Sequence, residues 1–275
     1  MVGPASNGLV ETTMLPFLPP EIFDLIVDHL HHQPTTLRSC CLVSKSWVPR
    51  ARRNLFAQVE FTSRQCSLQL WINTFPDPFN SPGHHTRSLH LYDIDSIIAA
   101  SAVAPTWVHH FCFIEELTVA NFTSDNSTPV SLVSLRGLSP TLRSLHIFHV
   151  SALLSEFFSL ICSFPLLEDL GLHFVTTSGH GWYSLPTSPR LTGSLHLTDP
   201  SPSVTRGLLD LPNGPHFSRI TASCPVESAK LVANLISKCS DTLESLTVAF
   251  DSPSSFPFTP MVVRRLTTID SAWAA

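Results

Sequence analysis

The sequence predicts an α/β solenoid, in which each repeat is one strand followed by one helix, preceded by a small unit of three short helices. Two observations carry this prediction. A short apolar pattern recurs seven times at nearly constant intervals, and the stretch before it has a helical rather than an alternating distribution of apolar residues. The composition agrees, because 43% of the 275 residues are apolar and can bury a large core.

The first helix is expected over residues 21–30. Pro19 and Pro20 stand where a missing amide hydrogen costs little, and Glu21 suits the positive end of a helix. The acidic residues of this helix fall at spacings of three and four, so they form one narrow stripe. Apolar side chains therefore cover most of the remaining circumference.

Two more short helices are expected in residues 35–43 and 46–56, with Ser46 as the N-cap of the last one. Three short helices in about 40 residues cannot form a self-sufficient core. The wide apolar arc of the first helix therefore needs another cover, and we expect a partner protein to dock there.

Seven strands are expected where the recurring pattern places two apolar residues two positions apart. An eighth is expected around Val59 and Phe61, 30 residues before the first. Steps of 28, 28, 25, 25, 25 and 26 residues separate the central apolar residues, which are Leu89, Leu117, Leu145, Leu170, Leu195, Ile220 and Leu246. Because residues two apart point to the same face of a strand, each segment has an apolar face that only stacked neighbours can bury.

Helices are expected to return the chain between strands. Residues 152–164 place Leu153, Phe157 and Leu160 on one stripe, and residues 227–239 do the same with Leu231 and Leu235. We expect a disordered tail over residues 1–14, the helices within 15–56 and the solenoid over 57–275. Leu266 and Ile269 could begin one more strand, but no polar capping repeat is visible. We therefore expect a solenoid without a C-terminal cap, shortened from a longer one.

The order of motifs in the first 56 residues is specific. L-P-x-E-I is followed by I-x-x-x-L, a single leucine and L-V-S-K-x-W, with Ser44 where a Cys is usual. This order resembles the F-box, and the resemblance implies docking on a Skp-type adaptor protein. The residues that the resemblance assigns to the adaptor interface, or to the small core behind it, are Leu18, Pro19, Glu21, Ile22, Ile26, Leu30, Leu37, Leu42, Val43, Lys45 and Trp47.

The segments between residues 59 and 250 resemble leucine-rich repeats, and phrases such as FPLLEDLGL are similar to those of fungal F-box proteins. One column departs from the family. Instead of the usual Asn or Cys three residues beyond the last leucine, this chain has Ile94, Phe122, Val150, Val175, Pro200, Pro225 and Asp251. The repeats are thus degenerate, with a mostly apolar or proline column in place of a hydrogen-bonding one.

The two resemblances together imply a substrate-receptor subunit of a Skp–cullin–F-box ubiquitin ligase. The F-box would bind the adaptor and, through it, a cullin, while the solenoid holds a target protein. The alternative is a scaffold that acts with a Skp-type adaptor outside any ligase. In both cases the chain supplies no catalytic group.

A candidate target-binding face follows from the strand pattern. The residue between the two inward apolar positions points away from the helices, as does the one two positions later. These two columns contain the tentative target-binding residues His90, Tyr92, His146, Phe148, His173 and His196. The other interpretation is that His and Thr merely suit a solvated strand face.

Several functions are not expected. No nucleophile elbow, phosphate loop or metalloprotease motif is present, so we expect neither an enzyme nor a cofactor. Adjacent His pairs point apart, which argues against a metal site. A net charge of −5 with only 13% charged residues argues against binding nucleic acid or a membrane. Scattered cysteines and no secretory signal predict reduced thiols in the cytoplasm, the nucleus or both.

Overall fold

The computed structural model describes residues 19–62, 68–93, 105–123, 132–138, 140–178, 190–251 and 261–264. The chain divides into two compact units, Met1–Leu55 and Phe56–Ala275, which we call the helical unit and the sheet unit. This division lies one residue before the expected one. The expected disordered tail, residues 1–14, lies outside the described residues.

The described part of the helical unit contains three helices, α1 (Pro20–His29), α2 (Pro34–Val43) and α3 (Val48–Leu55). Helices α1 and α2 each have proline in the first turn, where its fixed φ suits a helix and no needed donor is lost. The core that these helices share is small, and its buried residues are Val27, Leu37, Cys40 and Ala51.

Helix α3 begins later than expected, and Ser46 does not cap it. The Ser46 backbone N–H donates to Ser44 Oγ at 3.3 Å, and the Trp47 N–H donates to the Ser44 carbonyl at 3.1 Å. These bonds close a turn before the helix, so that the first helical residue is Val48.

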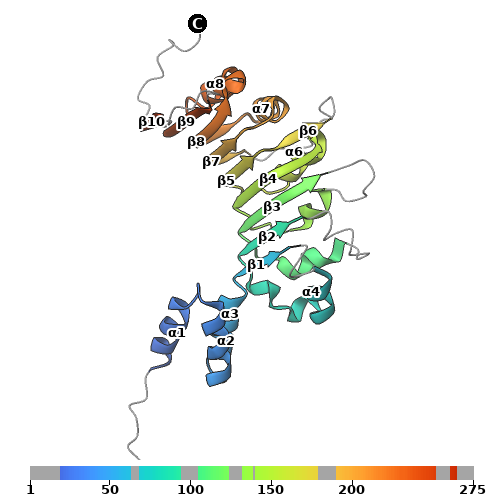
Figure 1. The fold of residues 1–275 in the computed structure, drawn as a ribbon, viewed down its shortest axis with the longest axis vertical. Helices are drawn as coiled ribbons and strands as arrows, with labels where there is room; N and C mark the ends of the chain where they lie inside the picture. Colours follow the sequence, from blue (N-terminus) through green and yellow to red (C-terminus); the bar gives the residue numbers. More distant parts are fainter. Residues whose placement is uncertain are drawn as a thin grey trace, which may run out of the picture. The chain divides into compact units, whose positions relative to one another are not determined.

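The sheet unit is built on a mostly parallel sheet, in which ten strands are described (Figure 1). Along the main path each strand pairs with the next, in the order β1-β2-β3-β4-β5-β7-β8-β9-β10, and β6 pairs with β4. The strands are β1 (Gln58–Phe61), β2 (Ser88–Tyr92), β3 (Glu116–Thr123), β4 (Ser144–Leu153), β5 (Asp169–His173), β6 (Thr176–Ser178), β7 (Thr192–Thr198), β8 (His216–Pro225), β9 (Ser245–Asp251) and β10 (Met261–Arg264).

The strand register is the one that the sequence predicts. Leu89, Leu117 and Leu145 are aligned across β2, β3 and β4, and the same row continues through the central residues of β5, β7, β8 and β9. All of these leucines except Leu246 are almost completely buried, as is Ile220. The helices lie along one face of the sheet (Figure 1), and the inward residues of the strands pack with them into one core.

The connecting segments differ along the sheet. They are α4 (Leu68–Thr74), η1 (Pro78–Asn80), η2 (Pro82–His85), η3 (Pro105–Phe111), η4 (Leu132–Gly137), α6 (Leu154–Ile161), α7 (Pro202–Leu209), η5 (Val226–Ser228) and α8 (Ala229–Lys238), where η marks a 3₁₀ helix. The described helices between β2 and β3 and between β3 and β4 are thus 3₁₀ helices, whereas an α-helix was expected in each repeat. These segments are only seven and six residues long, so an α-helix there would form too few hydrogen bonds to offset the cost of its nucleation.

Two expected α-helices are present but shorter. Helix α6 begins after Leu153, which ends β4 and is partly exposed, so Leu153 does not belong to the buried stripe. Helix α8 buries Val232 and Leu235, whereas Leu231 is only half-buried. The buried stripe of α8 is therefore rotated by one residue from the expected one.

A row of left-handed residues marks the point where five strands bend. Asp93, Asn121, His149, Phe174 and Asp199 have φ between 46° and 55°, a conformation that is rare outside glycine. In three of them the backbone N–H remains paired, because the N–H groups of Asp93, Phe174 and Asp199 donate to carbonyl groups of the next strand along the sheet.

The next residue of each of these bends belongs to the apolar column that departs from the leucine-rich-repeat pattern. The described members Phe122, Val150, Val175 and Pro200 are buried. The left-handed residue turns the chain so that this apolar side chain enters the core. Burial thus takes the place of the hydrogen bonds that an asparagine would make here.

The last described strand differs from the expected repeat. Strand β10 pairs with β9 in the antiparallel direction, whereas the strands from β1 to β9 are parallel to their neighbours. The expected further strand at Leu266 and Ile269 lies outside the described residues. Within the described ranges, no helix is long and apolar enough to cross a membrane.

Candidate functional sites

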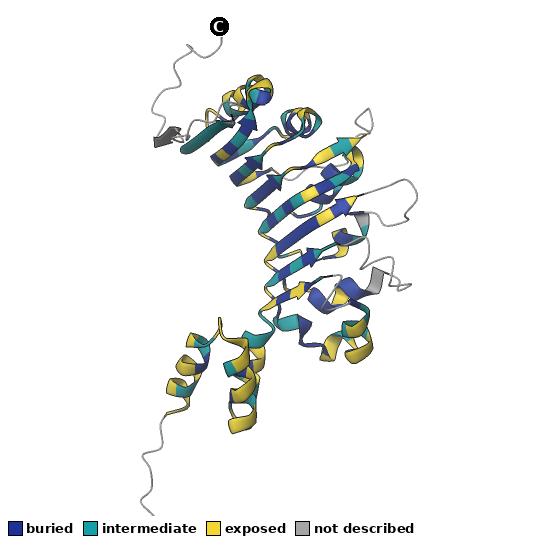
Figure 2. Cartoon of the chain, viewed as in Figure 1, coloured by how far each residue is buried: buried dark blue, intermediate teal, exposed yellow. Residues whose placement is uncertain are grey.

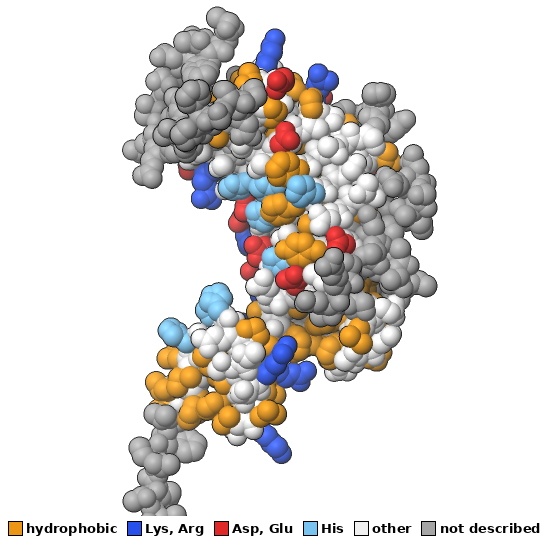
Figure 3. Space-filling view, viewed as in Figure 1, with side chains coloured by type: hydrophobic (Ala, Val, Ile, Leu, Met, Phe, Trp, Pro, Cys, Tyr) orange, Lys and Arg blue, Asp and Glu red, His pale blue; other side chains and the backbone are white. Residues whose placement is uncertain are grey.

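The helical unit exposes an unusual number of large apolar side chains. Ile22, Leu25 and Ile26 on α1 are 40–63% exposed, and at the end of α2 Leu42 is 88% and Val43 is 68% exposed. Figure 2 shows how much of these helices is exposed, and Figure 3 shows hydrophobic side chains gathered on their surface. We call these five residues the apolar patch of the helical unit.

A polar contact joins α1 to α3. Arg50 binds both carboxylate oxygens of Asp28, with Nε 2.6 Å from Oδ1, and Asn54 donates to the same Oδ1 at 2.9 Å. Hydrogen bonding to Arg50 lowers the pKa of Asp28 to about 2. Asp28 is therefore held against α3 although it is partly exposed, while the apolar side chains at positions 22, 25 and 26 are exposed.

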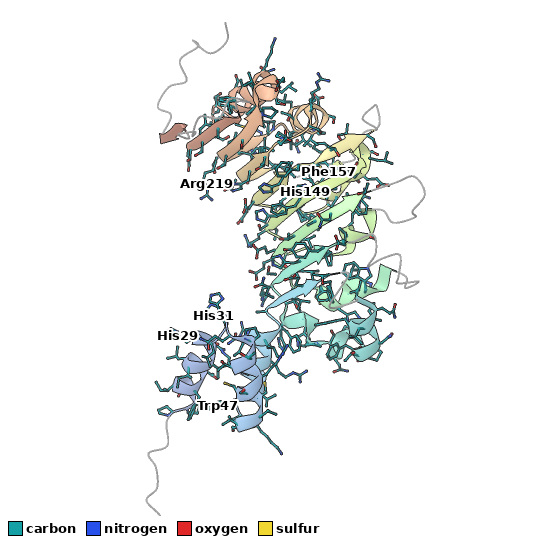
Figure 4. All side chains as sticks on the ribbon, in the orientation of Figure 1. His29, His31, Trp47, His149, Phe157 and Arg219 are labelled. Atoms are coloured by element: carbon teal, nitrogen blue, oxygen red, sulfur yellow. The ribbon has the colours of Figure 1, made fainter. Side chains whose placement is uncertain are left out.

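The residues expected at the adaptor interface separate into two groups. Those on the surface are Pro19, Glu21, Ile22, Ile26, Leu42, Val43 and Lys45. Leu37 is buried, and Leu30 and Trp47 are partly buried against the same core. The rings of Trp47 (Figure 4) and Phe23 lie 5.2 Å apart. Leu18 lies outside the described residues.

Leu25 is a patch residue that the motif comparison did not select. It follows Ile22 by three positions and is the most exposed apolar residue of α1. The signal was available in the helical spacing, because residues three apart share a face.

The second candidate site is the strand face that points away from the helices. The register aligns His90, Thr118, His146, Gly171 and His196 in one row. A second row, two residues further along each strand, aligns Tyr92, Ala120, Phe148, His173 and Thr198. Both rows agree with the columns read from the sequence. In Figure 3, His and hydrophobic side chains gather over the middle of this face.

Asp169 lies between two of these histidines. Its Oδ2 is 3.5 Å from His146 Nε2, and its Oδ1 is 3.4 Å from His196 Nε2. The Ser144 hydroxyl also donates to Oδ2 at 3.4 Å. Oδ1 is buried and receives no well-aligned hydrogen bond from the described residues, although His196 is close. The carboxylate thus connects side chains of β4, β5 and β7.

The rings beside Asp169 are stacked. Phe148 and His173 lie 4.3 Å apart at an interplanar angle of 5°, and His146 is 6.5 Å from His173. His173 Nδ1 is 2.9 Å from the Thr198 hydroxyl oxygen. Partial burial lowers the pKa of His173, and the neighbouring His146, His196 and His149 lower it further. These surroundings favour the neutral form of His173.

The other two expected target-binding residues stand apart. The rings of His90 and Tyr92 are 6.4 Å apart at 7°, and His90 Nε2 contacts Gln58 and Ser88 at 3.1 and 2.9 Å. Thr118 and Ala120 of β3 separate His90 and Tyr92 from the side chains around Asp169. The structure therefore brings together His146, Phe148, His173 and His196, which with Asp169 we call the ring cluster, and does not join His90 and Tyr92 to it.

Sequence reasoning missed Asp169 as a member of the site. It lies two residues before Gly171, in a row that also contains Ser144 and Glu116, so the register alone would have placed it on this face. No group of three or more His, Cys, Asp or Glu side chains with the geometry of a metal site occurs in the part of the chain that the structure describes.

Comparison of the sequence with protein-family models and with curated proteins gives no match.

Proposed function

We propose that this chain is the substrate-receptor subunit of a Skp–cullin–F-box ubiquitin ligase. In this proposal the helical unit is an F-box that binds a Skp-type adaptor, and the sheet unit is a degenerate leucine-rich-repeat solenoid that binds a target protein. The role is positional. The chain holds the target near the ubiquitin-loading machinery, which raises the effective concentration of its lysines, and supplies no catalytic group.

The observation that carries the proposal is the apolar patch of the helical unit. Five large apolar side chains stand exposed on two short helices whose shared core has only four buried residues among those described. Surfaces of this kind mark protein interfaces. The motif order that resembles the F-box lies on the same helices, and no motif of catalysis competes with it.

The experiment is co-purification from cells that contain a Skp-type adaptor and a cullin. We expect the wild-type chain to recover both, and the double variant Ile22→Ser, Ile26→Ser to recover at least tenfold less adaptor. Central apolar residues of an interface each contribute about 1–2 kcal/mol or more, and about 1.4 kcal/mol is a factor of ten. Because both side chains are exposed, the fold should survive.

Phe79→Ser is the matched control, because Phe79 is 92% exposed but lies in the sheet unit. Trp47→Ala is a poorer test, since Trp47 packs on the core and its loss would unfold the helices. Full recovery of adaptor by the double variant would contradict the proposal. Recovery of adaptor without cullin would support the scaffold that acts outside a ligase.

A further inference from the structure

The exposed strand face carries more negative than positive charge. Glu60, Glu116 and Asp169 lie in its rows, and Arg219 (Figure 4) is the one cation in strands β1 to β9. The neighbouring Arg87 and Arg143 precede these rows by one residue and are already paired with the glutamates at positions 115 and 168. Counting Asp, Glu, Lys and Arg side chains, this face carries three carboxylates against one guanidinium and is therefore negative.

The rings of β4 lie between two of these carboxylates. Ser144 of β4 is paired in register with Glu116 on one side and with Asp169 on the other. Since neighbouring strands are about 4.8 Å apart, the two acidic positions are roughly 10 Å apart. His146 and Phe148 follow Ser144 at two and four positions along β4, on the same face.

Gly171 provides room for this arrangement. A Cβ at Gly171 would lie 2.2 Å from His146 Nδ1 and 3.1 Å from His173 Nε2. The His146 ring therefore lies over the backbone of β5, beside Asp169. The stacked Phe148 and His173 stand next to it. Aromatic surface and carboxylate are thus presented together at one place on the sheet.

We infer that this face binds an arginine-bearing segment of a partner protein, whose guanidinium lies on the rings of His146 and Phe148 between Glu116 and Asp169. Guanidinium is planar and always charged, it stacks on aromatic rings and it pairs with carboxylates, so it matches both features of the surface. The inference rests on the proposed function in one respect, namely that this face meets a target protein.

The test uses four tripeptides, acetyl-Gly-Xaa-Gly-amide with Arg, Lys, Gln or Glu in the centre, added to the full chain at pH 7.5. NMR follows the His ring signals. We expect the Arg tripeptide to shift the His146 and His173 signals to saturation and to bind roughly two- to fivefold more tightly than the Lys tripeptide, because stacking favours guanidinium. The Glu tripeptide should leave these signals unchanged.

Three variants locate the contact. Asp169→Asn should weaken binding of the Arg tripeptide roughly two- to fivefold. Glu168→Gln, at the adjacent exposed glutamate that pairs with Arg143, should leave it unchanged. Phe148→Leu keeps apolar volume but removes the ring, so the Arg tripeptide should no longer bind more tightly than the Lys tripeptide.

Three results would overturn the inference: no saturable shift with the Arg tripeptide, equal affinity for Arg and Gln, or preference for Glu at pH 7.5. Adaptor recovery is measured on the same protein preparations, and Asp169→Asn should not change it. Peptide binding without adaptor recovery would contradict the proposed function but not this inference. Adaptor recovery without peptide binding would contradict this inference but not the proposed function.

Discussion

At the scale of the residue, two strand glycines look alike in the sequence, but a side chain is disfavoured at each of them for a different structural reason. Gly193 has a φ of 86°, and a Cβ there would lie 2.1 Å from the carbonyl oxygen of Glu168. Gly171 has no such backbone conformation, and its Cβ would meet the rings of His146 and His173, not backbone atoms. A backbone carbonyl in a sheet cannot move aside, whereas a partly exposed ring can.

We therefore expect opposite outcomes from the same substitution. Gly193→Ala should lower the free energy of unfolding by at least about 2 kcal/mol, because it combines a left-handed conformation with a backbone clash. Gly171→Ala should change it by less than about 1 kcal/mol, yet displace His146 from β5. Denaturant unfolding measures the first effect and the His146 ring signals measure the second. Equal losses of stability in both variants would show that this distinction is wrong.

The same scale shows what the sequence can and cannot reveal about the candidate site. The constant repeat length set the register, so His146, His196 and Phe148 were correctly placed on the exposed face. The contacts of Asp169 with two imidazoles depend on side-chain rotamers on three strands, and no local pattern encodes those. Leu25 was missed for a simpler reason, since the family motif rather than the helical spacing selected the residues.

At the scale of the element, the acidic stripe of α1 has a structural role that its pattern did not suggest. The spacing predicted only that these acidic residues form one stripe, and in the structure one of them, Asp28, binds Arg50 and Asn54 of α3. Amphipathic spacing predicts which residues share a face, not whether that face meets water or another helix. The row of left-handed residues was also only partly predictable. Asp and Asn tolerate a positive φ, so Asp93, Asn121 and Asp199 are typical of this conformation, whereas nothing in the sequence indicates it for His149 and Phe174.

Acid should loosen the helical unit through Asp28. Its folded-state pKa of about 2 lies below the ordinary 3.8, so the contact stabilises fully above about pH 4 and is lost as pH falls towards 2. Asp28→Asn should lower the midpoint of thermal unfolding of α1 and α3 by a few degrees at pH 7, since a partly exposed pair contributes modestly. The variant should also lose the acid dependence in that window.

Amide NMR signals of Val27 and Ala51 report this transition, with Leu145 in the sheet unit as the internal reference. Asp24→Asn is the control on the same helix, because Asp24 is exposed. An Asp28→Asn variant with the same midpoint and the same response between pH 4 and pH 2 as the wild type would show that the contact does not stabilise the helices.

At the scale of the whole molecule, the two units have very different cores. Four residues are buried in the described part of the helical unit, whereas the sheet unit buries a continuous core from β1 to β9 that includes Trp107, Phe111 and Phe157. The repeat length predicted strands that alternate with helices, and along the sheet the strands follow one another in sequence order. It did not predict the antiparallel β10, whose residues 261–264 come before the position at which the period places a further strand.

This difference predicts that the helical unit is marginally stable until a partner covers it. In hydrogen exchange, the amides of α1 to α3 should exchange far faster than those of β3 to β8 in the isolated chain, because little apolar surface is buried around them. A Skp-type adaptor at a hundred times its dissociation constant should slow the helical amides by roughly 100-fold, since ligand binding stabilises the bound state by about 2.7 kcal/mol at that ratio.

The double variant Ile22→Ser, Ile26→Ser serves as the control in this measurement. Its helical amides should exchange as in the wild type without adaptor and gain almost nothing when adaptor is added, because both side chains are exposed in the free chain. The strands of the sheet unit should be unaffected in every sample. Strong protection of α1 to α3 in the isolated wild-type chain would contradict the prediction, because it would mean that the apolar patch needs no partner to stabilise the helices beneath it.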